Sequence, residues 1–340
     1  MTYKRLEITD FGGPEVLNIV EESTLPEPAD NEVRVQVLVT SASFTDIMIR
    51  EGKYPEVKKK PPFTIGYDMV GIVDKTGSRV TGFKAGQMVA DLMVIGACSQ
   101  YVCLPEDLLT AVPDGLDPGE AVSLLLSYVT AYQMLNRIAR IQSGQRILVH
   151  GAGGAVGTAM IQLGRLLDLE IYGTASKAKH EMISGLGATP IDYRNEDFTD
   201  RIRAISGDGV DAVFDPIGGK NLKRSFAVLR PGGKLVCYGF YNAVLGKGGS
   251  IPLDFLRLKL WDVLPNQRSA SFYSIGAARK RHPEWFSADL AALFDLLAKK
   301  QIKPIIDRRL PMSEAAEAYK RIGNAEVNGK LILEVSKIPA

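Results

Sequence analysis

This 340-residue sequence has little cysteine and no long apolar run. Its 3 cysteines, Cys98, Cys103 and Cys237, form no Cys-x-x-Cys pair, so neither a disulfide framework nor a zinc ribbon is indicated. No apolar run approaches the roughly 20 residues needed to cross a bilayer, and no apolar signal region follows Met1. We therefore expect a cytoplasmic protein with no membrane partner.

An excess of charge of either sign is also missing. The 41 Lys and Arg residues against 39 Asp and Glu residues leave a formal net charge of +2, so no overall field would attract nucleic acid. The one basic run, 58–60, is interpreted as a solvated loop, with a phosphate-binding patch as the alternative. The hydrophobic fraction of 46% is that of an ordinary globular protein, and the length suffices for two domains.

The chain changes character near residue 117. Before it, glycines and prolines separate short apolar segments such as 33–39 and 68–73, which is typical of a small β-barrel. Asp117, with Glu120 three residues later, predicts the start of a long helix. Strands and helices then alternate, which predicts an α/β domain with a parallel, doubly wound sheet. The predicted strands of this region are 147–150, 170–174, 210–215 and 234–239, and its predicted helices are 156–167, 177–186 and 222–229. Nearer the C-terminus we predict helices at 283–300 and 313–322 and a strand at 330–335.

The segment 147–165, ILVHGAGGAVGTAMIQLGR, predicts a buried strand, a glycine turn and a helix. Its turn has the spacing Ala152-x-Gly154-x-x-Gly157, a dinucleotide fingerprint with alanine in the first glycine position. In such a turn Gly154 lets the backbone approach a pyrophosphate, and Gly157 lets the helix pack on the strand. The flanking strand and helix favour a dinucleotide site, and the alternative is a tight turn that serves packing alone.

The next strand end indicates which dinucleotide is bound. An NAD site would place Asp or Glu about 20 residues after the fingerprint, to bind the ribose 2′-hydroxyl. The segment 173–179, GTASKAK, contains no acidic residue, but it has hydroxyl side chains and the cations Lys177 and Lys179. Lysines at a helix start are often only solvated. The missing acid and the present cations nevertheless both favour a 2′-phosphate, so we predict NADPH as the cofactor.

Taken together, these features resemble the medium-chain dehydrogenase/reductases and, within them, the quinone oxidoreductase-like branch. The resemblance covers essentially the whole chain. Besides the glycine turn it rests on the segments 14–17 (PEVL), 43–46 (SFTD), 62–68 (PFTIGYD), 130–132 (TAY), 186–188 (LGA), 191–194 (IDYR), 230–233 (RPGG) and 329–331 (GKL).

The resemblance implies a Rossmann domain inserted in a GroES-like β-barrel catalytic domain. We expect the barrel in residues 1–120, the NADPH-binding domain in 121–265, and a segment 266–340 that completes the catalytic domain. The family usually forms homodimers through its Rossmann domain, so a homodimer is expected here.

Zinc-dependent members of this superfamily hold a catalytic zinc with Cys, His and Cys. The corresponding positions here are Ser43, Tyr67 and Leu126. Zinc needs thiolate, imidazole or carboxylate donors, which these residues do not supply. We therefore predict no metal. Without a Lewis acid an alcohol is not easily held as its alkoxide, so the acceptor should be electron-poor by its own conjugation.

Residues at the family's cofactor positions are assigned by resemblance, with two alternatives left open. The alternative for Thr130 is a helix residue whose hydroxyl bonds its own backbone. The alternative for Tyr193 is an ordinary half-buried tyrosine with no ligand role. The assigned contacts are Gly154, Ala155, Val156 and Gly157 at the pyrophosphate; Ser176, Lys179 and Tyr193 at the adenosine 2′-phosphate; Thr130, Tyr238, Gly239 and Asn328 near the nicotinamide; and Thr174 as a further cofactor contact.

Four residues are candidates for the catalytic site. Tyr54 matches an active-site tyrosine of the branch and could donate to an oxyanion, with packing on Pro55 as the alternative. Ser43 stands where quinone oxidoreductases usually carry Asn, and with Thr45 it forms a hydroxyl pair on one face if the segment is extended. Tyr67 is the further candidate. His150 is interpreted as a residue that bonds the backbone.

We conclude from the sequence that this is a zinc-free, NADPH-dependent oxidoreductase. Its partner would be a small-molecule electron acceptor, a quinone or an α,β-unsaturated carbonyl compound. One-electron and two-electron reduction both remain open. A non-catalytic NADPH-binding sensor or structural protein of the same fold is the alternative.

Overall fold

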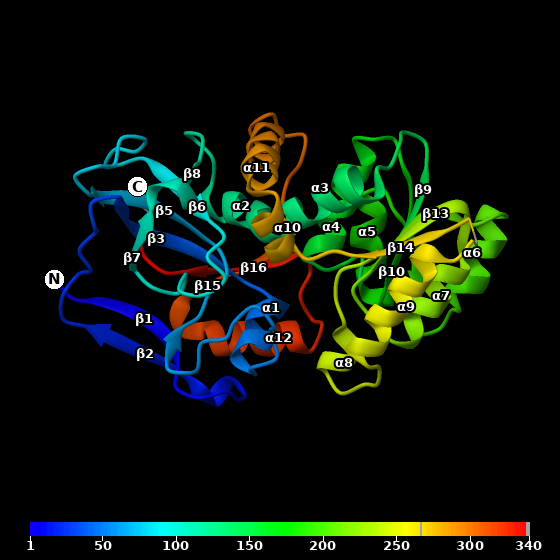
Figure 1. Ribbon diagram of the computed structural model, residues 1–340, viewed down its shortest axis with the longest axis horizontal. Coiled ribbons are helices and arrows are strands. Elements are labelled where there is room, and N and C mark those ends of the chain that lie inside the picture. Colours follow the sequence, from blue (N-terminus) through cyan, green and yellow to red (C-terminus); the bar gives the residue numbers. More distant parts are fainter. Residues whose placement is uncertain (266, 338–340) are drawn as a thin grey trace. The chain divides into compact units, whose positions relative to one another are not determined.

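The computed structural model describes residues 1–265 and 267–337, and the chain forms two compact units (Figure 1). The first unit consists of residues 1–126 together with the chain from Leu290 onward, and the second of Ser127–Asp289. One unit is thus built from both ends of the chain, with the other inserted between them. The unit boundaries fall later than the residues 120 and 265 expected from the sequence.

Six parallel strands form the sheet of the second unit, in the order β11-β10-β9-β12-β13-β14. Numbered along the chain this is the order 3-2-1-4-5-6 of a dinucleotide-binding fold, so the predicted parallel sheet is confirmed. Leu148, Val213 and Leu235 of its central strands are fully buried in one apolar core. The strands are β9 (Arg146–His150), β10 (Glu170–Ala175), β11 (Thr189–Asp192), β12 (Val210–Asp215), β13 (Leu229–Cys237) and β14 (Ser269–Phe272).

Helices connect these strands and begin within two residues of the positions predicted for 156–167 and 222–229. The segment predicted as one helix at 177–186 is a 3₁₀ turn followed by α5. Between α2 (Pro118–Ser123) and residue 139 the chain forms π-helical turns on either side of α3 (Val129–Gln133). The α-helices of this unit are α3 (Val129–Gln133), α4 (Ala155–Arg165), α5 (His180–Gly185), α6 (Phe198–Ser206), α7 (Lys220–Ala227), α8 (Tyr241–Val244), α9 (Ile251–Val263) and α10 (Ile275–Arg281).

Strand β14 extends the sheet beyond residue 265, where the sequence analysis ended the dinucleotide domain. Its Ala270 pairs with Leu235 of β13. A four-residue strand carries too little alternation to be found from sequence. Strand β13 also begins earlier than predicted, because residues 230–233 form an irregularity within it: the pairing with β12 jumps from Leu229 to Lys234.

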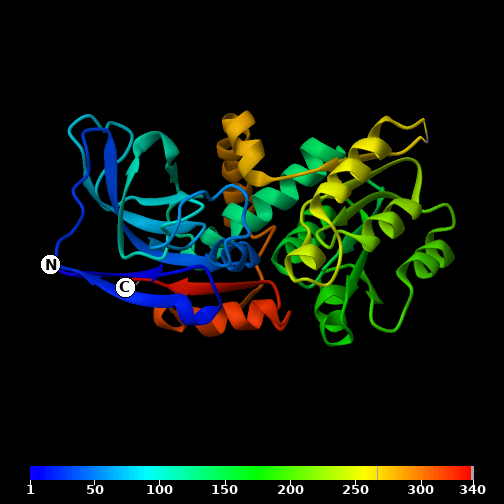
Figure 2. The ribbon, with the colours of Figure 1, turned by 60° about the horizontal axis from the view of Figure 1, so that its bottom comes forward.

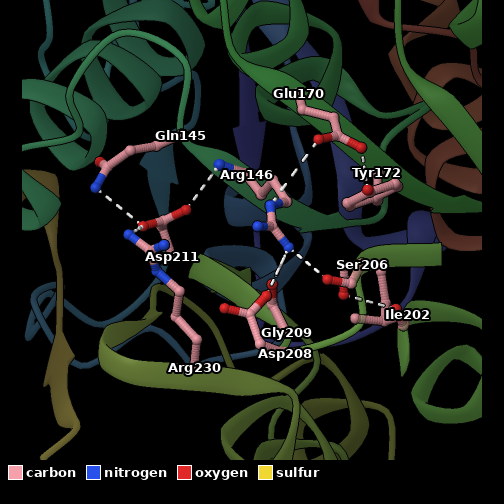
Figure 3. A network of polar contacts seen from close by, with 10 residues as sticks. All are labelled: Gln145, Arg146, Glu170, Tyr172, Ile202, Ser206, Asp208, Gly209, Asp211 and Arg230. Carbon is pink, nitrogen blue, oxygen red and sulfur yellow. Dashed lines mark hydrogen bonds and ion pairs between the residues drawn. The ribbon is translucent and has the colours of Figure 1, made fainter. Parts of the chain in front are cut away.

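A polar network joins the first residues of neighbouring strands in this sheet (Figure 3). The Asp211 carboxylate accepts from the Arg146 backbone N–H at 2.8 Å and from Gln145 Nε2 at 2.9 Å. The Arg146 guanidinium donates to Asp208 Oδ1 at 2.8 Å. Dinucleotides bind at the carboxyl ends of parallel strands, whereas this network stabilises the amino ends of the strands, away from that binding site.

The first unit contains a seven-stranded sheet, β15-β16-β3-β5-β6-β8 with β7 paired to β3, and a three-stranded sheet, β2-β1-β4. Strand β16, from the C-terminal part, pairs antiparallel with residues 39–42 of β3, as the resemblance implied (Figure 2, red strand). The strands are β1 (Tyr3–Ile8), β2 (Leu17–Glu22), β3 (Glu32–Ala42), β4 (Phe63–Thr64), β5 (Met69–Thr76), β6 (Met88–Asp91), β7 (Tyr101–Pro105), β8 (Thr110–Ala111), β15 (Ile306–Pro311) and β16 (Lys330–Glu334).

Short helices accompany these sheets, and the predicted start at Asp117 is confirmed. The Asp117 side chain caps α2, accepting from the Glu120 backbone N–H at 2.9 Å. The division between the units falls within α11. None of the helices in the described residues is long and apolar enough to cross a bilayer. The helices are α1 (Phe44–Arg50), α2 (Pro118–Ser123), α11 (Pro283–Ala298) and α12 (Ala315–Gly323).

Candidate dinucleotide site and tyrosine pair

The glycine turn lies between β9 and α4, with Gly154 as the residue that precedes the helix. The Gly154 N–H donates to the Gly151 carbonyl at 2.9 Å, and the Ala152 N–H donates to the Thr174 carbonyl at 3.0 Å. The turn is therefore closed by a hydrogen bond within its own backbone and is joined to the end of β10 by another. The first N–H groups of α4, at Ala155 and Val156, have no acceptor within the helix, so they are free to bind an anion.

Two glycines let this turn pack closely. A Cβ built on Gly157 would lie 2.4 Å from the Gly151 oxygen and 2.6 Å from Ala152 Cα, and both of those atoms are backbone. A Cβ on Gly173 of β10 would lie 2.7 Å from the Ala152 methyl. The alanine in the first fingerprint position is thus accommodated because residue 173 has no side chain. Sequence analysis noted Gly173 only as part of a segment and missed this role.

Cationic side chains lie beside the turn. The Lys179 side chain passes the turn at Gly153, where an added Cβ would lie 2.5 Å from Lys179 Cδ. Ser176 is half-buried and immediately precedes the 3₁₀ turn that contains this lysine. Tyr193 is 51% exposed and carries the Arg194 guanidinium over its ring at 5.8 Å. These placements leave Lys179, Ser176 and Tyr193 accessible to a ligand of the second unit.

Thr174 and His150 are placed differently from their sequence interpretations. The Thr174 hydroxyl is buried and lies 3.0 Å from His150 Nδ1. His150 Nε2 lies 3.0 Å from Ser225 Oγ, which donates to Asp215 Oδ2 at 2.7 Å. The expected backbone role of the His150 ring is therefore wrong, because both ring nitrogens bond side chains. Burial lowers the pKa of His150, which favours the neutral imidazole.

The residues predicted near the nicotinamide are distributed over both units. In the second unit, the phenol of Tyr273 donates to Gln133 Oε1 at 2.8 Å, and the Thr130 side chain lies beside that phenol and helps to set its pKa. A Cβ on Gly239 would lie 2.9 Å from the Pro216 oxygen, and the Tyr238 N–H donates to the Asp215 carbonyl at 3.0 Å. In the first unit, the side-chain oxygen of Asn328 is buried and has no partner among the described residues.

A pair of tyrosines lies in the first unit. Tyr54, in the chain after α1, and Tyr67, just before β5, have their hydroxyl oxygens 2.7 Å apart. Their rings meet edge to face, with centroids 5.9 Å apart. Tyr67 is fully buried, whereas Tyr54 is half-buried. Of the four predicted catalytic residues, these are the two whose functional groups the structure brings together.

Ser43 and Thr45 do not form the expected hydroxyl pair. Ser43 precedes α1 and forms a capping box with Asp46: its hydroxyl donates to Asp46 Oδ2 at 2.6 Å, and its N–H donates to the same oxygen at 2.8 Å. Thr45 lies in the first turn of α1, so the segment is helical and not extended. The proposed common face is therefore wrong, and the Ser43 proton is used within the cap.

Sequence analysis missed a buried charged cluster formed by Asp46, Asp68 and Lys330. Asp68 accepts from the Ser41 N–H at 2.9 Å and from the Ser41 hydroxyl at 2.7 Å, and Lys330 Nζ lies 3.9 Å from Asp68 Oδ2. Burial raises the pKa of Asp46 to about 7 and also raises the pKa of Asp68. Burial lowers the pKa of Lys330. No spacing pattern links residues so far apart in the chain.

Comparisons with known proteins agree with this architecture. Residues 29–114 match the alcohol dehydrogenase GroES-like domain, and residues 186–333 match the zinc-binding dehydrogenase model. The chain is 32% identical to the synaptic vesicle membrane protein VAT-1 homolog of Danio rerio, over 98% of this chain and 70% of that protein. The structure resembles Escherichia coli quinone oxidoreductase complexed with NADPH, with a TM-score of 0.86 and 28% identity over 98% of this chain and 100% of that one. It also resembles CurK enoyl reductase, with a TM-score of 0.85 and 25% identity over 98% and 99% of the two chains.

The residues at the family's zinc positions do not suit that metal. The Tyr67 hydroxyl bonds Tyr54, the Ser43 hydroxyl bonds Asp46, and Leu126 has no donor atom. Within residues 1–265 and 267–337, no three His, Cys, Asp or Glu side chains gather as a metal site requires. The donor chemistry of these side chains thus disagrees with the name of the matching family model.

Proposed function

Because this chain belongs to the zinc-free, quinone oxidoreductase-like branch of the medium-chain dehydrogenase/reductases, we propose that it is an NADPH-dependent oxidoreductase acting without catalytic zinc. Its acceptor would be a small molecule, either a quinone or an α,β-unsaturated carbonyl compound. Both classes spread incoming negative charge through their own conjugation, which suits a site whose residues supply no Lewis acid.

The residues around the glycine turn of the second unit suit the phosphate groups of a dinucleotide. The absence of a side chain at Gly157 lets α4 pack closely on the turn, and the first N–H groups of that helix would bind a pyrophosphate. Lys179 lies beside that turn and, with the half-buried Ser176, would hold the 2′-phosphate, with Tyr193 at the adenosine end. When bound, NADPH supplies the hydride. The protein's part is to hold the cofactor and to bind the acceptor oxygen.

The observation that carries the proposed chemistry is the Tyr54 to Tyr67 hydroxyl contact of 2.7 Å. A phenol stands at a zinc-ligand position of the family and bonds a second phenol. Burial raises the pKa of Tyr54 to about 12, so it stays a hydrogen-bond donor at neutral pH. Such a donor stabilises the oxyanion that forms on a reduced quinone or enone, and solvent can then protonate it.

The test is NADPH oxidation, followed by absorbance, with a benzoquinone, a naphthoquinone, phenanthrenequinone, a linear enone and an alkenal. NADH is run in parallel, and a Gly157→Ala variant serves as the control for background reduction. We expect turnover with NADPH that is largely lost in the variant. Zinc in a stoichiometric amount together with alcohol oxidation would contradict the proposal.

A non-catalytic NADPH-binding protein is the second candidate. The similarity to VAT-1 homolog favours it, because that protein's name states a vesicle membrane and no reaction. NADPH fluorescence distinguishes the two: tight binding with no turnover against the whole panel supports the binding protein, and turnover excludes it.

We also propose that the chain forms a homodimer through its second unit. Helix α9 exposes Leu253 (44%), Leu256 (62%), Leu260 (50%) and Val263 (76%). Their spacing of three, four and three residues places them on one face, as in a helix that packs against another. The adjacent β14 is the last strand in the sheet order, which supports association at this edge.

A further inference from the structure

The hydroxyl contact between Tyr54 and Tyr67 has a direction that the distance alone does not give. Each phenol has one proton to donate, and either oxygen can accept. If Tyr54 donates to Tyr67, the Tyr67 proton needs another acceptor. If Tyr67 donates to Tyr54, the Tyr54 proton remains for a different partner.

Burial decides between these arrangements. Tyr67 is 0% exposed, and among the described residues Tyr54 is the one hydrogen-bond partner of the Tyr67 hydroxyl. A buried O–H without an acceptor costs about 1–3 kcal/mol, so we expect the Tyr67 hydroxyl to donate its hydrogen bond to Tyr54 Oη. Tyr54 is half-buried and can turn its own proton toward solvent or a ligand.

The electrostatic surroundings keep both phenols protonated. Burial is the main cause of the raised pKa of both phenols, and the negative charges of Asp46 and Glu56 raise both further. Both phenols therefore keep their protons at neutral pH, so each has one proton to donate.

We propose that Tyr67 is a positioning residue: it donates to Tyr54 Oη and so directs the Tyr54 proton to the carbonyl oxygen of the electron acceptor. This role rests on the proposed reductase function. The pair would select acceptors whose reduction places negative charge on an oxygen. Neither tyrosine loses its proton in this step, because Tyr54 stabilises the oxyanion by a hydrogen bond and a water molecule supplies the proton that completes the product.

The first test measures the direction without any turnover. 3-Fluorotyrosine at position 54 reports its own ionisation by ¹⁹F NMR, in the wild-type background and with Tyr67→Phe. Loss of a donor should raise the pKa at position 54 by about half to one unit. An unchanged or lowered pKa would overturn the proposal, because loss of an acceptor acts in the opposite direction. Tyr101→Phe, another half-buried tyrosine of the same unit, should leave the value unchanged.

The reciprocal label keeps the test valid if Tyr67→Phe does not fold. With 3-fluorotyrosine at position 67, Tyr54→Phe removes the acceptor of the Tyr67 proton. The pKa at position 67 should then fall, and a rise would overturn the proposed direction.

The second test is a double-mutant cycle in steady-state turnover with phenanthrenequinone. Tyr54→Phe should lower kcat by about 100-fold, and Tyr67→Phe by about 5- to 10-fold with little change in KM. In the Tyr54→Phe background, Tyr67→Phe should have no further effect. Losses that multiply would show that Tyr67 acts independently and would overturn its positioning role. A wild-type protein that reduces no acceptor would remove the proposed function and this acceptor role with it, while the NMR result would still decide the proton direction.

Discussion

The Lys179 side chain lies against the glycine turn, so close that a Cβ on Gly153 would lie 2.5 Å from Lys179 Cδ. Both residues belong to the second unit. The cation assigned to a 2′-phosphate therefore lies beside the turn assigned to a pyrophosphate. A single dinucleotide bound at this turn would therefore be within reach of the Lys179 side chain.

Reversing the charge at position 179 should change cofactor preference. In Lys179→Glu the 2′-phosphate loses a charge-assisted hydrogen bond and meets a like charge, so we expect NADPH to bind about 10- to 100-fold more weakly. NADH, which lacks the phosphate, should bind about as before. Fluorescence titration with both cofactors gives the two dissociation constants.

Lys223→Glu is the matched control, since Lys223 is an exposed cation on α7 of the same unit. It should leave the ratio of the two affinities unchanged. Equal weakening of NADPH and NADH by Lys179→Glu would mean that this lysine supports the turn and does not read the phosphate.

A methyl group at position 157 should damage both the turn and cofactor binding. The added Cβ would lie 2.4 Å from the Gly151 oxygen, a backbone atom that moves only with the turn. We expect Gly157→Ala to lower the free energy of unfolding by about 1–3 kcal/mol and to weaken NADPH binding at least tenfold. Urea unfolding and fluorescence titration measure the two effects.

Gly185→Ala is the control for this change. Gly185 lies in α5, and a Cβ there meets nothing within 4 Å. Alanine should be neutral or slightly stabilising at that position, because it favours the helix. A Gly157→Ala variant with wild-type affinity would show that the turn serves packing alone.

The Asp46 carboxyl should make stability depend on pH. Burial raises the pKa of Asp46 from 3.8 to about 7 in the folded protein. Between these values the folded state holds a proton that the unfolded chain has released, so stability falls as pH rises. The stability that the protonated Asp46 carboxyl contributes is fully present below about pH 4 and is lost as pH rises through about 7. Over this range the free energy of unfolding falls by at most about 1.4 kcal/mol per pH unit.

Asp46→Asn removes this titration and keeps an oxygen that accepts from the Ser43 N–H. Urea unfolding of both proteins at pH 5, 6, 7 and 8 gives the difference in their free energies of unfolding. We expect the wild type to lose stability relative to the variant up to about pH 7 and the difference to level off above it. A difference that stays constant over this range would place the folded-state pKa of Asp46 below 5.

Local signals explain why much of the dinucleotide unit was predictable from the sequence. The strand, turn and helix of 146–165 are adjacent in the chain, and Gly157 has its role within that segment. Strand β14 was missed because it has four residues and follows a helix. Thr174 was assigned to the cofactor by resemblance, and it lies at the end of a predicted strand. The direction of its side chain depends on His150, which lies on the neighbouring strand.

Contacts between distant segments explain what the sequence could not predict in the first unit. Tyr54 and Tyr67 were both candidates, but the bond between them joins two irregular segments with no periodicity to align them. Lys330 approaches Asp68 only because β16 pairs with β3 and β3 with β5. Such tertiary relationships have no local sequence pattern, so they appear only with the fold.

Helix α9 should carry the subunit interface, and two charges on it should separate the subunits. Leu256 is 62% exposed and Leu260 is 50% exposed on the same face of the helix. Leu256→Glu combined with Leu260→Glu would bury two carboxylates from each subunit in any interface formed there. The cost of removing these charges from water should prevent the subunits from associating. Light scattering after gel filtration should give twice the chain mass for the wild type and the single mass for the variant. Leu108→Glu, which charges a 41% exposed leucine of the first unit, should remain dimeric. A wild-type monomer would contradict the dimer itself, and a dimeric double variant would place the interface on another face.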